Sequence, residues 1–250
     1  MYCWQCGTKA LDDAKFCGEC GARIGKPAEE NVDNDSVDVK SVFSNISIGD
    51  IVNFGKYYQK DTETKESVEW LVLDVEKDKF LAISKYILDV HAYGEMSKNY
   101  WCMSEIRKWM NGPLYRNLFD AEERKKICTY IPKETLVFDV RESGDKIFLL
   151  SEDQAQEYFI NDKQRCAKST TYARERGGYF LKPDESWPWW LMDTVGFGIN
   201  AYVTGADSCS SGFFETYVTG ADSYLDVGQI DSVSSESGYI GVRPAIWIKK

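Results

Sequence analysis

The chain has 250 residues and a mass of 28.6 kDa, enough for one sizeable domain and a small attachment. Its net charge of −10 opposes non-specific binding to nucleic acid and to anionic lipid, and it favours a basic ligand. No apolar run is long enough for a membrane-spanning helix, and the first residues lack the pattern of a secretion signal. We therefore expect a cytoplasmic protein that does not insert into membranes.

The first 20 residues contain two Cys-x-x-Cys pairs, each followed by glycine, formed by Cys3 with Cys6 and Cys17 with Cys20. A tight turn in each pair can point two thiolates at one ion, and glycine permits the positive φ that carries the backbone past it. Four thiolates complete the tetrahedron that Zn²⁺ prefers and leave no open position for catalysis. The spacing predicts a structural Zn²⁺ site. Two disulfides or four free thiols are the alternatives, and iron would need a redox role that nothing else in the sequence supports.

Residues 1–25 resemble the short zinc ribbons found at the N-termini of many bacterial proteins. The segment has few large apolar side chains, so the metal must hold it folded, a contribution of roughly 10–16 kcal/mol in such peptides. Its basic and acidic side chains cancel, which favours protein docking or capping of the chain over nucleic-acid binding. These charged residues are Lys9, Asp12, Asp13, Lys15, Glu19 and Arg23.

Residues 26–47 are rich in acids and poor in large apolar side chains, which predicts a flexible linker. The main domain is expected over residues 48–250. It begins with three strand patterns, 48–55, 68–75 and 79–84, that predict an antiparallel meander.

Helix starts follow the meander, each with a capping residue. The first helix is expected to end at Asn111-Gly112-Pro113, and residues 147–150 are expected to form a buried strand. Aromatic residues make up 14% of the chain, and neither a regular strand–helix alternation nor a glycine-rich phosphate loop occurs. The fold class is therefore predicted as α+β, with an antiparallel sheet and short helices. The capping residues are Ser104, Asp120 with Glu123, and Ser151 with Gln154.

Near the C-terminus, the heptapeptide Tyr202–Ser208 recurs unchanged at Tyr217–Ser223. The stretch from Met192 to Val242 has seven acids and no Lys or Arg, so we expect an electronegative surface of strands and loops. Strand periodicity points Val203 and Val218 to the core and the neighbouring Tyr and Thr outward. A duplication that enlarges a surface loop without a ligand is the alternative. The predicted ligand-binding residues are Tyr202, Thr204, Asp207, Ser208, Tyr217, Thr219, Asp222 and Tyr224.

Several stretches of the main domain resemble an uncharacterised bacterial domain family that often follows zinc ribbons or membrane anchors. The closing Gly-Val-Arg-Pro-Ala is similar to the Gly-Phe-Arg ending of C-type-lectin-like folds, which include formylglycine-generating enzymes and variable proteins diversified by retroelements. This resemblance implies a C-type-lectin-like domain over residues 48–250 that presents its last strands and loops to a ligand. Met192 departs from the Arg expected in most relatives, which weakens any inference of an ion pair there. The stretches are Trp70–Asp74, Ser104–Asn111, Phe148–Ser151, Trp189–Leu191 and Gly241–Ala245.

These observations predict a non-enzymatic protein that binds a protein or carbohydrate ligand and has no catalytic residue. His91 is the only histidine, and it is expected to be structural because no partner for a general base is identifiable. Four tryptophans are expected in the core instead of a binding site. They are Trp187, Trp189, Trp190 and Trp247.

Two other functions stay open at this point. A hydrolase, or a Cys-dependent modifying enzyme on a formylglycine-generating-enzyme-like scaffold, would need two acids or two thiols that converge in a cleft. A structural adaptor would act through the ribbon alone. Calcium bound by the C-terminal acids is a minor option, because no EF-hand spacing supports it. The cysteines outside the ribbon are Cys102, Cys128, Cys166 and Cys209.

Overall fold

The strands form two sheets, whose orders are β1-β2-β3-β9 and β4-β8-β5-β6-β7. Neighbouring strands are antiparallel, apart from β5 and β8, which pair in parallel. The predicted α+β class, with antiparallel sheets and short helices, is confirmed. The computed structural model describes residue 43 and residues 45–94, 100–132, 144–177, 186–195, 200–204, 231–234 and 240–250.

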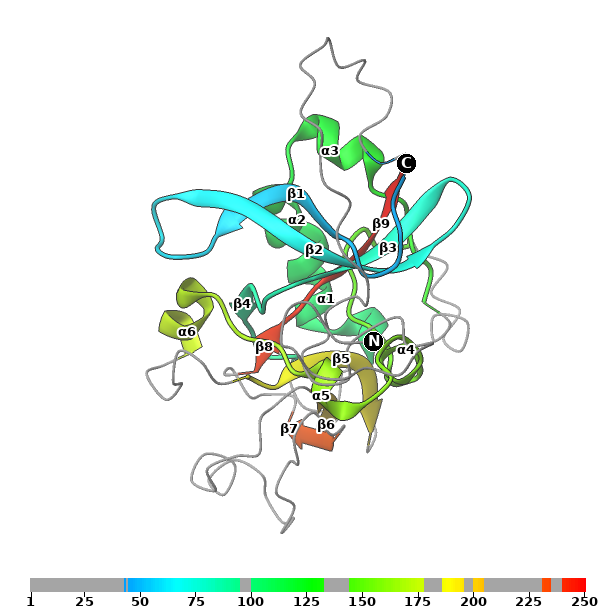
Figure 1. Ribbon diagram of the computed structural model, residues 1–250. Coiled ribbons are helices and arrows are strands. Elements are labelled where there is room, and N and C mark those ends of the chain that lie inside the picture. The colour runs from blue at the N-terminus through cyan, green and yellow to red at the C-terminus, as the bar shows by residue number, and fades with distance from the viewer. Residues whose placement is uncertain are drawn as a thin grey trace, which may run out of the picture.

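The first sheet is the predicted meander, closed by a strand from the end of the chain (Figure 1). Its strands are β1 (Ile51–Tyr58), β2 (Lys65–Val75), β3 (Lys79–Ser84) and β9 (Ala245–Lys249). Alternate residues of β2 are buried, as expected of a strand with one face on the core: these are Val68, Trp70 and Val72. β9 pairs with β3, so the end of the chain completes the sheet that its first strands begin.

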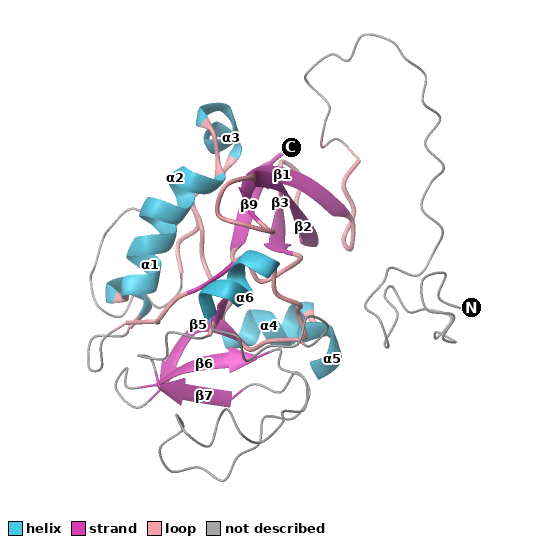
Figure 2. Ribbon diagram, turned by 90° about the vertical axis from the view of Figure 1, so that its left-hand side faces the viewer, coloured by secondary structure: helices cyan, strands magenta, loops and turns pink. Residues whose placement is uncertain are grey.

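The second sheet gathers short strands from distant parts of the chain. They are β4 (Asp89–Val90), β5 (Trp189–Val195), β6 (Asn200–Thr204), β7 (Asp231–Ser234) and β8 (Gly241–Val242). In Figure 2, β5, β6 and β7 lie side by side below the helices α4 (Glu152–Tyr158) and α6 (Thr171–Gly177), and the first sheet lies above them. β8 and β9 are separated by only two residues, so the chain passes directly from one sheet to the other.

The helix that begins after Ser104 is longer than its sequence predicts. α1 (Glu105–Trp109) continues through a wide turn, Met110–Leu114, into α2 (Tyr115–Leu118). The prediction that it ends at Asn111-Gly112-Pro113 is wrong. A wide i→i+5 turn gives the ring of Pro113 room and does not need its missing N–H, so the helix passes through the proline.

The helix starts themselves agree with the sequence. The side chain of Ser104 accepts a hydrogen bond from the backbone N–H of Arg107. α3 (Ala121–Lys126) begins at the capping box of Asp120, and α4 begins at that of Ser151. A further short helix, α5 (Asp162–Arg165), is capped by Asn161. The three predicted starts, at Ser104, Asp120 and Ser151, are confirmed, because each cap satisfies backbone donors of its own first turn and needs no distant partner.

The core lies between the sheets and the helices and is rich in aromatic side chains. Residues 147–150 are fully buried, but they pair with β9 only through the bridge of Phe148 to Ala245, so they form an extended segment and not the predicted strand. The prediction that four tryptophans pack in the core is confirmed. Trp187, Trp189, Trp190 and Trp247 are all less than 10% exposed.

Gly55 provides a test of how tightly α2 closes on the first sheet. Its φ is +71°, and an added Cβ would lie 2.7 Å from ring carbons of Phe119 and 2.9 Å from the carbonyl oxygen of Leu118. Gly55→Ala should lower the free energy of unfolding by about 2–3 kcal/mol through strain and overpacking. Gly112→Ala is the control, because its nearest contact would be Arg116 at 3.8 Å. Urea denaturation of the full chain measures both, and equal effects would contradict the prediction.

Candidate functional site

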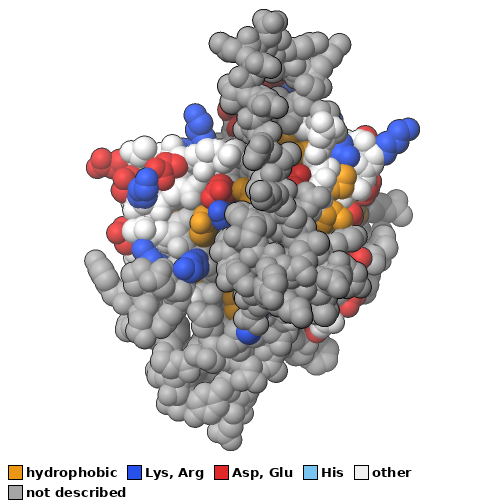
Figure 3. All heavy atoms as spheres, in the orientation of Figure 1, with side chains coloured by type: hydrophobic (Ala, Val, Ile, Leu, Met, Phe, Trp, Pro, Cys, Tyr) orange, Lys and Arg blue, Asp and Glu red, His pale blue; other side chains and the backbone are white. Residues whose placement is uncertain are grey.

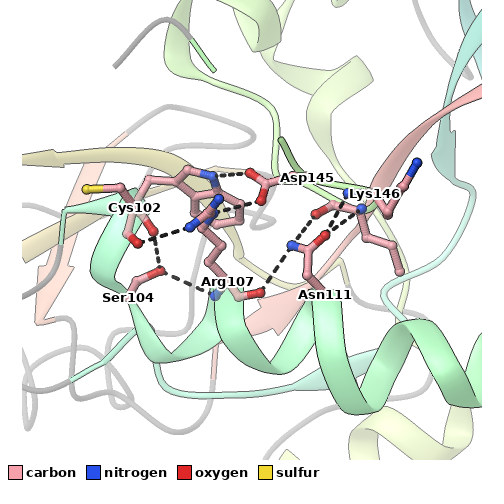
Figure 4. Close-up of polar contacts among 8 residues, drawn as sticks. Cys102, Ser104, Arg107, Asn111, Asp145 and Lys146 are labelled. Carbon is pink, nitrogen blue, oxygen red and sulfur yellow. Dashed lines mark hydrogen bonds and ion pairs between the residues drawn. The ribbon is translucent and has the colours of Figure 1, made fainter. Parts of the chain in front are cut away.

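A buried ion pair fastens the start of α1 to the segment before residue 147 (Figure 4). Asp145 Oδ1 accepts a hydrogen bond from Arg107 Nε at 2.7 Å, and its Oδ2 accepts one from the indole N–H of Trp101 at 2.7 Å. The carboxylate is only 2% exposed. Arg107 also donates to the carbonyl oxygen of Cys102 at 3.0 Å. Both carboxylate oxygens are thus held by donors from the segment that opens this helix.

Asn111 extends this network along the same helix (Figure 4). Its Nδ2 donates to the carbonyl oxygens of Arg107 and Ile147, and its Oδ1 accepts from the backbone N–H groups of Lys146 and Ile147. Its amide makes four hydrogen bonds, which is its usual full capacity. The residue predicted to end the helix is therefore the one that ties it to the buried segment.

A second buried carboxylate joins the two sheets. Asp89 in β4 accepts hydrogen bonds from the hydroxyl of Tyr57 in β1 and from Nε of Arg176 in α6, both at 2.6 Å. Its side chain is 2% exposed, whereas that of Arg176 is 48% exposed. Burial and the nearby carboxylate raise the pKa of Tyr57, so its hydroxyl remains a donor to Asp89.

Arg243 occupies the crossing between β8 and β9 and is fully enclosed. Its Nε donates to the carbonyl oxygen of Ser84 at 2.9 Å. One of its terminal nitrogens lies 3.5 Å from the carbonyl oxygen of Arg165. The guanidinium also stacks on Phe159 and Trp189, with 5.4 and 5.1 Å to the ring centres. Burial lowers its pKa to about 9. This arginine, singled out in the closing Gly-Val-Arg-Pro-Ala, supports the junction of the two sheets.

Sequence reasoning did not find the two buried ion pairs. Asp145 lies 38 residues from Arg107, and Asp89 lies 87 residues from Arg176. No local pattern joins residues so far apart, and only the fold brings them together. Because the charged groups of both pairs already bind each other, we interpret them as structural.

The residues considered for an enzyme have local contacts or lie outside the described residues. The Nδ1 of His91 lies 2.6 Å from the carbonyl oxygen of Ala92, and its ring stacks on Trp109 at 4.7 Å, contacts of the structural kind expected for it. The thiols of Cys102, Cys128 and Cys166 are half-buried. The thiol-enzyme alternative also involves Cys209, which lies outside the described residues.

The described part of the chain offers no metal site: within it, no group of three or more His, Cys, Asp or Glu side chains could hold a metal ion. None of its helices has the length and apolar character needed to cross a membrane.

A small, mostly apolar pocket lies between β2 and the helices α4 and α5. Burial, with the nearby carboxylate of Asp74, raises the pKa of Tyr158 in its wall to about 12, so this hydroxyl is neutral at ordinary pH. The lining contains no charged side chain that could orient a reaction. It is formed by Ile48, Leu71, Val72, Leu73, Tyr158, Phe159 and Gln164.

The first copy of the repeated heptapeptide enters the second sheet. Tyr202 and Thr204 belong to β6, where Tyr202 lies opposite Ser232 of β7 and Thr204 opposite Trp189 of β5. The expected strand is therefore present at this copy. The other predicted ligand-binding residues lie outside the described residues: Asp207, Ser208, Tyr217, Thr219, Asp222 and Tyr224.

The connection between β6 and β7 is unusually long for two paired neighbours. β6 ends at Thr204 and β7 begins at Asp231, and the two strands pair antiparallel. Residues 205–230, called here the β6–β7 connection, therefore link two strands of a hairpin, where two to five residues are usual. Long connections of this kind in compact domains often carry function. The candidate ligand site is thus the end of the second sheet from which this connection leaves.

Two family models match separate parts of the chain. The family model DUF6273, a domain of unknown function, matches residues 77–250, and the model of a zinc-ribbon domain matches residues 2–24. Neither a curated protein nor a solved structure matches the chain. The prediction of an N-terminal zinc ribbon is confirmed by the match over residues 2–24. The DUF6273 match begins in the turn after β2, although β1 and β2 complete the same sheet.

The zinc-ribbon match contains all four cysteines predicted to bind metal, which lie outside the described residues. A set of four thiols in two Cys-x-x-Cys pairs fits Zn²⁺, whose structural sites are tetrahedral and rich in sulfur. When bound, the metal supplies folding free energy to this segment and no open coordination position.

The ion pair of Asp145 predicts a pH-dependent defect. Burial raises the pKa of Asp145, while the hydrogen bonds from Trp101 and Arg107 oppose the rise. Arg107→Met removes the cation and should lower the free energy of unfolding by about 3–5 kcal/mol at pH 7. Because the folded-state pKa then rises further above the unfolded value, the lost stability should return as pH falls through that raised pKa, down to about 4.

Urea denaturation of the full chain at pH 7, 6, 5 and 4 measures this defect against the wild type. Lys125→Met is the matched control, because its ion pair with Glu122 is exposed and should matter little at any of these pH values. A defect in Arg107→Met that is independent of pH would contradict the role assigned to Asp145.

Proposed function

The chain belongs to the DUF6273 family, and we propose that it is a non-enzymatic recognition protein that presents the β6–β7 connection to a protein or carbohydrate ligand. One observation carries this proposal. β6 and β7 are paired neighbours, yet residues 205–230 lie between them in the chain. A framework that holds both ends of a long segment at one edge of a sheet is suited to presenting that segment.

The composition of the β6–β7 connection supports a role in binding. It is rich in Gly and Ser and contains Tyr217 and Tyr224, residue types that give contact area and hydrogen bonds at low entropic cost. It has four acidic residues and no Lys or Arg, so a basic ligand would complement it. These acidic residues are Asp207, Glu215, Asp222 and Asp226.

The charge of this connection differs from that of the acidic surface elsewhere. Acidic and basic side chains are mixed over the turn between β1 and β2 (Figure 3). There Lys60 lies 2.6 Å from Glu66, so part of the acidic charge is neutralised locally. The segment of residues 205–230 itself contains no Lys or Arg that could neutralise its acids in the same way.

We further propose that the scaffold is C-type-lectin-like. Support comes from the path of the closing residues, which cross from β8 to β9 through Arg243, and from the position of the β6–β7 hairpin shortly before them. The lectin-like variable proteins likewise present side chains from their last strands and loops. In this arrangement Tyr202, Thr204, Asp207, Ser208, Tyr217, Thr219, Asp222 and Tyr224 form the ligand surface.

The ribbon is proposed to be structural, with Zn²⁺ held by Cys3, Cys6, Cys17 and Cys20. A site of four thiolates needs reduced cysteines, which fits the cytoplasm as the proposed compartment. The ribbon would then serve as a folded module attached ahead of the described domain and would have no part in chemistry.

The zinc content of purified full-length protein tests these ligands. The wild type should contain about one Zn²⁺ per chain by elemental mass spectrometry, and Cys6→Ser with Cys20→Ser should contain less than a tenth of that, because each pair loses a thiolate. Cys128→Ser is the control, since this half-buried thiol lies outside the ribbon. Full zinc content in the double variant would refute the assignment.

Binding to probes of defined charge tests the proposed function. Fluorescent nine-residue peptides of graded net charge and a set of neutral glycans are titrated against the full chain at about 0.15 M salt. The wild type should prefer basic peptides, and Asp207→Asn, Tyr217→Ala, Asp222→Asn and Tyr224→Ala combined should bind at least about tenfold more weakly. The reason is that both charge and aromatic contact area are lost.

The matched control for this experiment is Glu63→Gln with Asp78→Asn. It removes the same number of negative charges from exposed positions in the turns of the first sheet and should change affinity less than about twofold. Unchanged binding by the combined variant, with an unaltered melting temperature, would refute the proposed surface. Loss of binding in the zinc-free Cys6→Ser, Cys20→Ser variant instead would favour an adaptor that acts through the ribbon.

A further inference from the structure

The repeated heptapeptide gives the second sheet two identical candidates for one strand position. The first copy supplies Tyr202, Val203 and Thr204 to β6, between β5 and β7. The second copy, Tyr217–Ser223, follows 15 residues later within the same hairpin connection. We propose that the second copy can replace the first between β5 and β7, so that the protein exchanges between two arrangements of this hairpin.

The pairing register makes the two arrangements equivalent at the repeated positions. In the described arrangement Val203 lies opposite Trp190 of β5 and Asp231 of β7. After exchange, Val218 would take that place, with Tyr217 and Thr219 at the positions of Tyr202 and Thr204. Slipping a strand by one residue would turn every side chain to the opposite face, but this exchange returns the same residue type to each of the three repeated positions of β6.

The residues just before the two copies differ in a way that the sheet tolerates. Asn200 and Ala201 form the first part of β6, and Glu215 and Thr216 would replace them. Thr has a higher strand propensity than Ala, and Asn and Glu are both weak strand formers. Neither arrangement is therefore strongly favoured by these two positions.

The connections also leave the two arrangements close in free energy. At present residues 196–199 join β5 to β6, and residues 205–230 join β6 to β7. After exchange these connections would be residues 196–214 and 220–230. The cost of loop closure grows only with the logarithm of loop length, so the change amounts to a factor of about three in the equilibrium constant.

The exchange would move part of the chain from one end of the sheet to the other. Because adjacent strands are antiparallel, the β5–β6 and β6–β7 connections leave β6 from opposite ends. Residues 205–214, including Phe213 and Phe214, would therefore be transferred between these ends. A ligand that binds one arrangement more tightly would draw the population toward it.

Disulfides between β7 and the strand beside it can trap each arrangement. The variants are made in the full chain with Cys209→Ser, which removes the cysteine that lies between the two copies. Tyr202→Cys with Ser232→Cys reports the described arrangement, and Tyr217→Cys with Ser232→Cys reports the exchanged one. Both pairs should form a disulfide within a single chain, in yields within about tenfold of each other after mild oxidation. Peptide mapping by mass spectrometry identifies each bond.

Tyr217→Cys with Val233→Cys is the matched control, because neighbouring residues of a strand point to opposite faces. Its disulfide should form at least about tenfold less. Equal yields for the 232 and 233 pairs would show a freely sampling loop and would overturn the proposal. A disulfide of the 217–232 pair that forms only between two chains, or not at all, would also overturn it.

Proline substitutions give an independent readout, since proline cannot donate to a strand ladder. If either copy can serve, Val203→Pro and Val218→Pro should each reduce amide hydrogen-exchange protection of β5 and β7 less than about tenfold. The double variant should reduce it by more than about a hundredfold. A loss in Val203→Pro alone that equals the loss in the double variant would refute the exchange.

Discussion

The enclosed guanidinium of Arg243 is the contact on which the placement of the two sheets depends. A buried cation has lost its hydration and must be compensated by other groups. Here the compensation comes from the carbonyl oxygens of Ser84, at the end of β3, and Arg165, at the end of α5, and from the faces of Phe159 and Trp189. Since β8 and β9 flank this residue, compensating the charge fixes where the chain leaves one sheet and enters the other. Burial opposes this charge and lowers the pKa of the guanidinium.

β5 carries this placement from the junction to the hairpin. The indole N–H of Trp189 donates to the carbonyl oxygen of Arg165, the same oxygen that Arg243 approaches. The indole N–H of Trp190 donates to the carbonyl oxygen of His91. Met192 is buried, and its backbone N–H donates to Leu150. β5 is thus held along its first residues by three different parts of the chain. β6 and β7 follow β5 outward in the sheet, so the proposed ligand-binding segment is joined through β6 to a strand with three such anchors.

The sequence predicted correctly the features that depend on neighbouring residues, and it missed those that depend on residues far apart in the chain. The caps at Ser104, Asp120 and Ser151, and the hairpin between β2 and β3, depend on neighbours within a few residues, and the sequence predicts them correctly. The continuation of the helix through Pro113 depends instead on tertiary contacts. Asn111 donates a hydrogen bond to the distant carbonyl oxygen of Ile147, and Met110 is buried in the core. The ion pairs of Asp145 and Asp89 join residues far apart in the chain. For the candidate site, the sequence identified the repeat, but only strand pairing showed that β6 and β7, the strands before and after residues 205–230, are neighbours.

The spacing of the repeat limits how its two copies can be used. Side chains along a strand alternate with a period of two, and the copies are separated by 15 residues, an odd number. In one uninterrupted strand, Val203 and Val218 would therefore face opposite sides of the sheet, and the copies would not be equivalent. Equivalence requires a break between them, and the Gly, Ser and Asp residues that follow Thr204 favour such a break. Each copy must then establish its own pairing, and since β6 lies between β5 and β7, that position can hold one copy at a time. The second copy can therefore contribute its side chains to the proposed ligand surface, or take the place of the first copy in the sheet, but it cannot pair between β5 and β7 at the same time as the first.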